Sequence, residues 1–139
     1  MPSGSASVWH YDANEKLRIG AVTFKNGHAS IGYRDANGKL RIMASTGQNN
    51  VATITHLDAN GKKRIVAVTQ LDGNATITHF DINRRKRIMS GTWADRDAVI
   101  MHLDANKEDR ISSIIGADGD TSIMLSDANG QSRVMVDNK

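Results

Sequence analysis

The chain contains no cysteine, which excludes both a disulfide framework and a thiolate metal site. Its single proline is Pro2, so no proline interrupts hydrogen-bonded ladders along the rest of the sequence. Aromatic residues make up 4% of the chain, too few for a platform on which single-stranded nucleic acid would stack. No apolar run approaches the roughly 18 residues of a membrane-spanning helix. We therefore expect no nucleic-acid partner and no insertion into a membrane.

Neither the net charge nor the first residues indicate a particular binding partner or an export signal. The formal net charge is +3, and lysines and arginines recur at regular intervals, as on an evenly solvated surface. Residues 1–7 lack the basic stretch and apolar run of a signal peptide. The expectation is cytoplasmic synthesis, which agrees with the absence of cysteine.

A repeat of 23 residues runs through the sequence without a gap. Each copy has an Asp, an Asn two residues later, an Arg four residues after that, and then a branched apolar residue. The aspartates that mark the copies are Asp12, Asp35, Asp58, Asp81, Asp104 and Asp127. We place a lead-in at residues 1–6 and a single repeat domain at 7–139, with repeats 7–29, 30–52, 53–75, 76–98, 99–121 and 122–139.

One repeat is typical of a β-hairpin. Residues 53–57 and 64–69 are rich in β-branched side chains, and Asn60-Gly61 between them is the favoured pair of a two-residue type I′ turn. A second turn is expected at residues 72–74. Six such repeats predict an all-β protein of about twelve short antiparallel strands.

The predicted turn fixes a register within the hairpin. It places His56 opposite Ile65, Ile54 opposite Ala67, and Leu57 opposite Arg64. A three-residue loop at 72–74 would place Thr69 opposite Ile77 and keep the isoleucines of successive repeats on one face, whereas a two-residue loop would reverse the faces.

The charged columns distinguish an antiparallel meander from a parallel β-solenoid. In a solenoid, identical aspartates or arginines would stack about 4.8 Å apart and repel one another. In a meander, equivalent residues lie two strands apart, at about 9.6 Å, and opposite charges can interleave. The sequence therefore favours the meander.

A single-layer meander leaves its isoleucine face to be covered, by closure into a barrel, by a propeller-like ring, or by copies of the same chain. The small side chains of this face favour a homotrimer, a β-prism or intertwined β-helix, because three sheets could approach closely around an axis. The predicted ladder of the oligomer core is Ile19, Ile31, Ile42, Ile54, Ile65, Ile77, Ile88, Ile100, Ile111 and Ile123.

A column of histidines accompanies these isoleucines. Its members are His10, His56, His79 and His102, with Tyr33 and Leu125 at the equivalent positions. Around a three-fold axis, imidazoles could bind a metal or an anion, or form a polar layer that fixes the register. Tyr33 and Leu125 favour the polar layer, so no cofactor or metal is expected. If the histidines are buried and neutral, assembly should weaken below about pH 6.

Two further features carry weaker functional hypotheses. The Asp-Ala-Asn-Gly turn is similar to the start of a calcium loop but lacks the later acidic ligands, so its Asp is expected to cap backbone amides. Trp9, Tyr11 and Trp93 could stack on sugar rings, which supports a multivalent carbohydrate-binding module as the alternative function. These aromatic residues do not recur with the repeat.

No nucleophile–base motif, phosphate loop or H-E-x-x-H sequence is present, and near-equal repeats offer no unique place for an active site, so we expect no enzyme. The segments at 35–42 and 58–65 resemble the D-x-x-G-K-x-R-aliphatic repeats of bacterial and phage proteins and, more loosely, the shafts of tail fibres and spikes. The resemblance implies a homotrimeric, elongated structural element associated with a virion or appendage. The sequence does not identify what the assembly attaches to; a glycan or a host surface is one candidate partner besides further copies of the chain.

Overall fold

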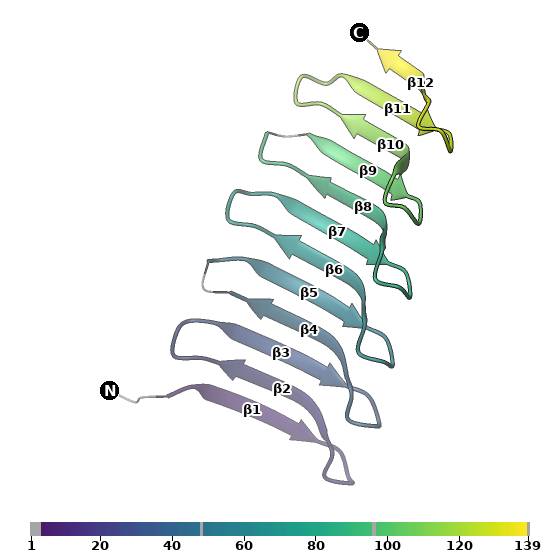
Figure 1. Ribbon diagram of the computed structural model, residues 1–139. Coiled ribbons are helices and arrows are strands. Elements are labelled where there is room, and N and C mark those ends of the chain that lie inside the picture. The colour runs from purple at the N-terminus through teal and green to yellow at the C-terminus, as the bar shows by residue number, and fades with distance from the viewer. Residues whose placement is uncertain (1–3, 48, 96, 139) are drawn as a thin grey trace. The chain divides into compact units, whose positions relative to one another are not determined.

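The computed structural model describes the backbone of residues 4–47, 49–95 and 97–138, and side chains in these ranges up to Arg133. Every regular element in these ranges is a β-strand (Figure 1). The chain divides into two compact units, Met1–Leu71 and Asp72–Lys139. Each unit is described by itself.

Each unit contains six strands that follow one another in chain order. The strands of unit 1 are β1 (Ala6–Tyr11), β2 (Leu17–Thr23), β3 (Ala29–Arg34), β4 (Leu40–Thr46), β5 (Ala52–Leu57) and β6 (Lys63–Thr69). The strands of unit 2 are β7 (Ala75–Phe80), β8 (Lys86–Thr92), β9 (Ala98–Leu103), β10 (Asp109–Ile115), β11 (Thr121–Ser126) and β12 (Ser132–Asn138). Neighbouring strands within each unit pair antiparallel. The predicted all-β meander of hairpins is confirmed, and the solenoid is excluded.

The hairpin turn differs from the predicted two-residue type. In the third repeat, the Gly61 N–H donates to the Asp58 carbonyl at 3.0 Å, and the Asp58 N–H donates to the Lys62 carbonyl at 2.9 Å. Three residues, 59–61, therefore form the loop. Gly61 is its left-handed member, with a φ of 75°. This is the geometry of a type I turn followed by a bulge residue.

A β-bulge follows each of these turns in the first five hairpins, and the arginine that recurs in every repeat is its extra residue. In the third repeat Leu57 faces Lys63 rather than Arg64, while His56 faces Ile65 and Ile54 faces Ala67, as predicted. The predicted partner of Leu57 is wrong because Arg64 is the extra residue of the bulge. The bulge restores the alternation of faces after a three-residue turn.

The second connection has the predicted length of three residues but lies one residue earlier than predicted. In unit 1, the Phe24 N–H donates to the His28 carbonyl at 2.7 Å, so residues 25–27 form the loop. Thr23 then faces Ala29, and Ala21 faces Ile31. The predicted pair of Thr69 with Ile77 belongs to the boundary between the units. The equivalent pairing inside unit 1 is offset from it by two residues, which preserves the faces.

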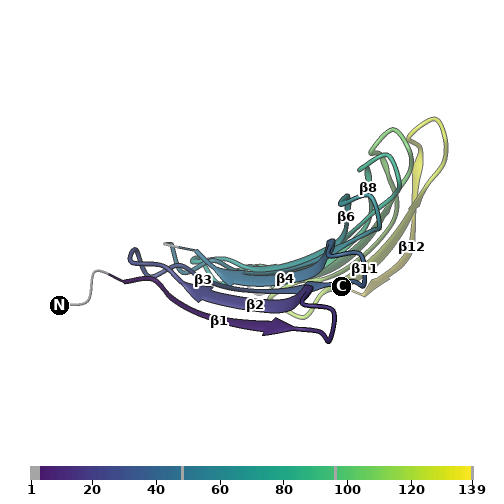
Figure 2. The ribbon, with the colours of Figure 1, turned by 90° about the horizontal axis from the view of Figure 1, so that it is seen from below.

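Each unit is a single layer of strands, and no helix or second sheet among the described residues covers it (Figure 2). One side carries the repeated isoleucines and is called the isoleucine face. The other side carries Met43, Thr55, Thr78, Met89 and Met101 and is called the methionine face. The best-covered side chains lie on the methionine face. They are Thr55, Thr78, Val99 and Ser112, which are between 4% and 9% exposed.

Methionine side chains account for part of this burial. Thr55 pairs with Met43 on one side and Val66 on the other. In unit 2, Ser112 pairs with Met101 and Met124. Ser112 is thus a small residue between two long, flexible neighbours, which shield it without any second layer. The isoleucine ladder is thus not a core within either unit.

Candidate functional site

The isoleucine face is built from two rows that run across the strands. In unit 1 the first row alternates branched and small residues: Val8, Ala21, Ile31, Ala44, Ile54 and Ala67. The second row of unit 1 is His10, Ile19, Tyr33, Ile42, His56 and Ile65. Neither row contains an Asp, Glu, Lys or Arg. The surface is therefore ridged, apolar and free of fixed charge.

Unit 2 repeats the same pattern with serine in place of alanine. Its first row includes Ile77, Ser90, Ile100, Ser113 and Ile123. Its second row includes His79, Ile88, His102, Ile111 and Leu125, and ends at Arg133. Arg133 joins this row because the bulge in the last hairpin lies two residues later than in the others.

The isoleucine face is open to solvent. Ile54 is 47% exposed in unit 1, and Ile100 is 49% exposed in unit 2. A water-exposed isoleucine forgoes the roughly 1.5–3 kcal/mol that full burial of such a side chain would provide. A contiguous exposed apolar surface is typical of an interaction site.

The predicted histidine column lies on this face. His56 pairs with Ile42 and Ile65 on its two sides, and His102 pairs with Ile88 and Ile111. Within the described part of the chain, no three or more His, Asp or Glu side chains form a group that could hold a metal ion.

The aspartates at the hairpin turns act as backbone caps, as predicted. Asp35 Oδ1 accepts the N–H groups of Asn37 at 2.9 Å and Lys39 at 3.0 Å, and its Oδ2 accepts from Arg41 at 3.3 Å. Partial desolvation raises the pKa of Asp35, but these hydrogen bonds outweigh it and hold the pKa below the ordinary value. For Asp12, Asp58 and Asp81 the backbone N–H four residues later is the main cause of a lowered pKa. For Asp104 the main cause of the lowered pKa is the Arg110 side chain.

The bulged arginines connect successive hairpins. Arg41 Nε donates to the Leu57 carbonyl at 3.1 Å, and Arg87 Nε donates to the Leu103 carbonyl at 2.9 Å. Lys39 Nζ adds a bond to the Ala59 carbonyl at 3.0 Å. The Asp–Arg pairs are half-exposed, at distances between 2.5 and 4.0 Å. These columns hold the turns of each unit together.

The three aromatic residues proposed for sugar stacking lie in different places. Trp9 and Tyr11 belong to β1 and share the methionine face of unit 1, where they are 46% and 60% exposed. Trp93 begins a connection in unit 2, where its N–H donates to the Asp97 carbonyl at 2.9 Å. Trp9 and Tyr11 therefore form a local patch on unit 1, and the three aromatic residues do not form a repeated array.

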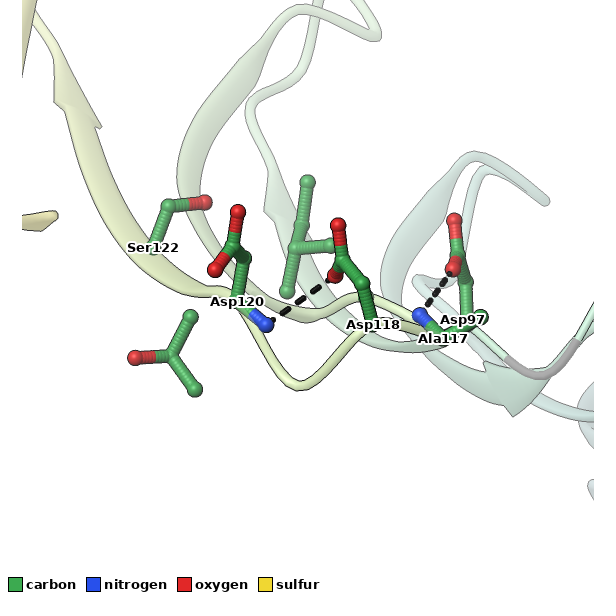
Figure 3. A pocket seen from close by; sticks show the side chains of 8 residues that line it. Asp97, Ala117, Asp118, Asp120 and Ser122 are labelled. Atoms are coloured by element: carbon green, nitrogen blue, oxygen red, sulfur yellow. Dashed lines mark hydrogen bonds between the residues drawn. The ribbon is translucent and has the colours of Figure 1, made fainter. Parts of the chain in front are cut away.

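A hollow of about 430 Å³ lies at the connections of unit 2 (Figure 3). Its lining includes Asp97, Asp118 and Asp120. Asp97 Oδ1 accepts the Ala117 N–H at 2.9 Å, and Asp118 Oδ1 accepts the Asp120 N–H at 3.0 Å (Figure 3). The carboxylates of Asp97 and Asp118 thus cap the backbone of the loops, as the turn aspartates do.

Sequence reasoning missed the methionine face. The signal was available, because Met43 and Met89 occupy one repeat position and Met101 and Met124 occupy another. The pairing of Trp9 with Gly20 was also missed, since it becomes visible only when the register is known.

These observations define a class of protein: single-layer antiparallel sheets built from tandem hairpins. No helix in the described residues is long and apolar enough to span a membrane. No family model matches the chain, and no curated protein matches its sequence.

A search of solved structures finds similarity to the TCP domain of SAS-4 (dCPAP) from Drosophila melanogaster, solved in complex with a proline-rich motif of Ana2 (dSTIL). The TM-score is 0.51 at 13% sequence identity, and the match covers 100% of this chain and 87% of that one. At this identity the likeness concerns the fold alone.

Proposed function

We propose that this chain is a structural or assembly protein that associates with further copies of itself through the isoleucine face, and that it has no catalytic activity. The observation that carries the proposal is the exposed, uncharged isoleucine face of unit 1. The SAS-4 domain was solved with a motif of another protein bound, so a sheet of this kind can serve in assembly.

A second copy is the partner that fits the surface best, because it has the same period. In unit 1, each branched residue of the first row alternates with an alanine, as in Ala44, Ile54 and Ala67. This alternation forms ridges and grooves that repeat every two strands, about 9.6 Å. Ridges of one copy can enter the grooves of another along the whole row, as side chains of facing sheets interdigitate.

The homotrimer remains the favoured stoichiometry within this proposal. Alanines and serines at alternate positions let sheets approach closely around a three-fold axis, and three copies would cover three equivalent faces at once. Such an assembly would supply the apolar burial that a single layer lacks. A shaft-like element of a fibre or spike is the corresponding biological role, with a glycan or host surface as its target.

Light scattering coupled to size-exclusion chromatography tests the proposal. We expect the full chain to elute as a particle of three times its mass of 15.1 kDa. Ile54→Lys and Ile100→Lys should each shift the mass toward the monomer, because a buried ammonium without a partner opposes association. Leu71→Lys is the matched control, since Leu71 is 72% exposed and lies in a connection. A monomeric wild-type chain at high micromolar concentration would refute self-association.

The histidines give an independent readout of the same interface. His56 lies between Ile42 and Ile65, in a row of unit 1 without any fixed charge. Protonation would place cations inside the apolar contact, so the oligomer should dissociate more readily at pH 5 than at pH 8. His56→Leu should reduce this difference.

A further inference from the structure

Trp9 and its cross-strand neighbours depart from the repeat in a coordinated way. The positions equivalent to Trp9 hold Gly32, Thr55, Thr78, Met101 and Met124. The residue opposite Trp9 is Gly20, and the next residue across the sheet is Gly32. A glycine inside a strand weakens it, and commonly marks a close approach of another group.

The Trp9 ring makes that close approach. A Cβ atom at Gly20 would lie 2.4 Å from Cζ3 of Trp9 and 2.7 Å from its Cε3, so the six-membered ring rests on the Gly20 backbone. Trp9 Nε1 donates to Ser7 Oγ at 2.9 Å, which fixes the ring in this orientation. The side chain is nevertheless 46% exposed, so the ring is supported on one side and open on the other.

The surroundings extend the ring into a platform. Tyr11 lies on the same face two residues along β1, about 6.7 Å away along the strand, and is 60% exposed. Gly32 continues the floor beyond Gly20, where the end of the Leu40 side chain leans over it. Ser7 and Ser30 supply hydroxyl groups in the adjoining row of the same face. The guanidinium of Arg34, which also lies on this face, already donates to the Gly38 carbonyl at 2.9 Å.

We propose that this Trp9–Tyr11 platform binds a neutral polysaccharide by stacking of its sugar rings. The flat face of a pyranose with equatorial hydroxyls presents polarised C–H groups, and these are attracted to the negative face of an aromatic ring. Serine and tyrosine hydroxyls can bond to the hydroxyls at the rim of the sugar. Trp9, Tyr11 and the glycines beneath them carry no charge, and the nearby guanidinium of Arg34 is held by the Gly38 carbonyl, so stacking on the platform needs no charged group on the polymer.

The shape of the platform favours a sugar over a proline-rich peptide. Polyproline helices dock in grooves whose walls are aromatic side chains. Here the indole lies on the Gly20 backbone and is 46% exposed, so it presents an open ring face rather than the wall of a groove. The platform and the isoleucine face lie on opposite sides of unit 1, so glycan binding is independent of the proposed self-association.

Affinity electrophoresis in native gels tests the proposal with hydroxyethyl cellulose, soluble glucomannan, alginate and poly-L-proline as probes. We expect one or both neutral polysaccharides to retard the full chain. Trp9→Ala should weaken this binding about tenfold, since an aromatic contact and its buried area are lost. Gly20→Ala should weaken it as well, because the added methyl displaces the ring while leaving it present. Trp93→Ala is the matched control, since it removes the same kind of side chain from a connection of unit 2, outside both the platform and the two rows of the isoleucine face.

Circular dichroism of each variant establishes that it is folded. In the Trp93→Phe chain, Trp9 is the remaining indole, and its fluorescence should shift to the blue when a neutral polysaccharide is added. Retardation by alginate or poly-L-proline alone would overturn the proposal. So would neutral binding that Trp9→Ala and Gly20→Ala leave unchanged.

Discussion

Left-handed backbone at the hairpin turns predicts a measurable cost for one methyl group. Gly61 has a φ of 75°, and a Cβ atom placed there would meet no atom within 4 Å. Gly61→Ala therefore adds backbone strain and no collision. The left-handed region costs an L-residue roughly 1–2 kcal/mol. Alanine also lowers the conformational entropy of the unfolded chain, which stabilises the folded state by about 0.4–1 kcal/mol. We expect a net loss of about 1 kcal/mol in the free energy of unfolding.

The opposite change is expected where the repeat has no glycine at this turn position. Arg84 and Lys107 occupy the equivalent turn position with φ values of 65° and 72°. Lys107→Gly should relieve this strain and raise the free energy of unfolding by up to about 1 kcal/mol. A pair of opposite changes at equivalent positions separates backbone strain from any effect of the side chain.

Thermal unfolding followed by circular dichroism measures both changes. For a chain of this length, 1 kcal/mol corresponds to a shift of roughly 3–5 °C in Tm. Gly47→Ala is the control, because Gly47 has no positive φ and its nearest neighbour would be the Val51 carbonyl at 3.8 Å. If Gly61→Ala melts no lower than Gly47→Ala, the strain argument is refuted.

Three further expectations concern the turns and the sheet. The pKa values of Asp12, Asp35, Asp58, Asp81 and Asp104 are lowered on folding. Their contribution to stability is complete above the unfolded pKa, near 3.8, and is lost as the pH falls through the lower folded values. Tm should therefore drop steeply below about pH 4, and Asp58→Asn should lessen the drop. An equal drop in the Asp58→Asn chain would refute the capping role of Asp58. Gly91→Ala should destabilise unit 2 by about 1–3 kcal/mol in urea titration, because its Cβ would lie 2.6 Å from the Ala75 carbonyl oxygen. Arg41→Met should cost about 0.5–1 kcal/mol in the same titration, since the bond to the Leu57 carbonyl is half-exposed. An unchanged midpoint would show that the bridge between hairpins contributes nothing.

The sequence determined the features that depend on near neighbours in the chain. The 23-residue period, the hairpins, the capping aspartates and the side on which Ile54 and His56 lie all follow from local turn chemistry and the two-residue alternation of strands. Each capping aspartate accepts the N–H groups two and four residues later in the chain, so its hydrogen bonds need no tertiary contact. These features could be predicted because the same residues recur in each repeat.

The tertiary structure decided what depends on cross-strand partners. Asn60-Gly61 is compatible with a two-residue turn, and only the ladder shows a three-residue turn compensated by a bulge at Arg64. The better-covered face is likewise not readable from hydrophobicity, because the flanking Met43 and Val66 cover Thr55 while the more apolar Ile54 stays exposed. Trp9 meets Gly20 only once β1 and β2 are aligned. Local propensity fixes the strands, whereas the alignment of one strand on the next fixes which side chains meet.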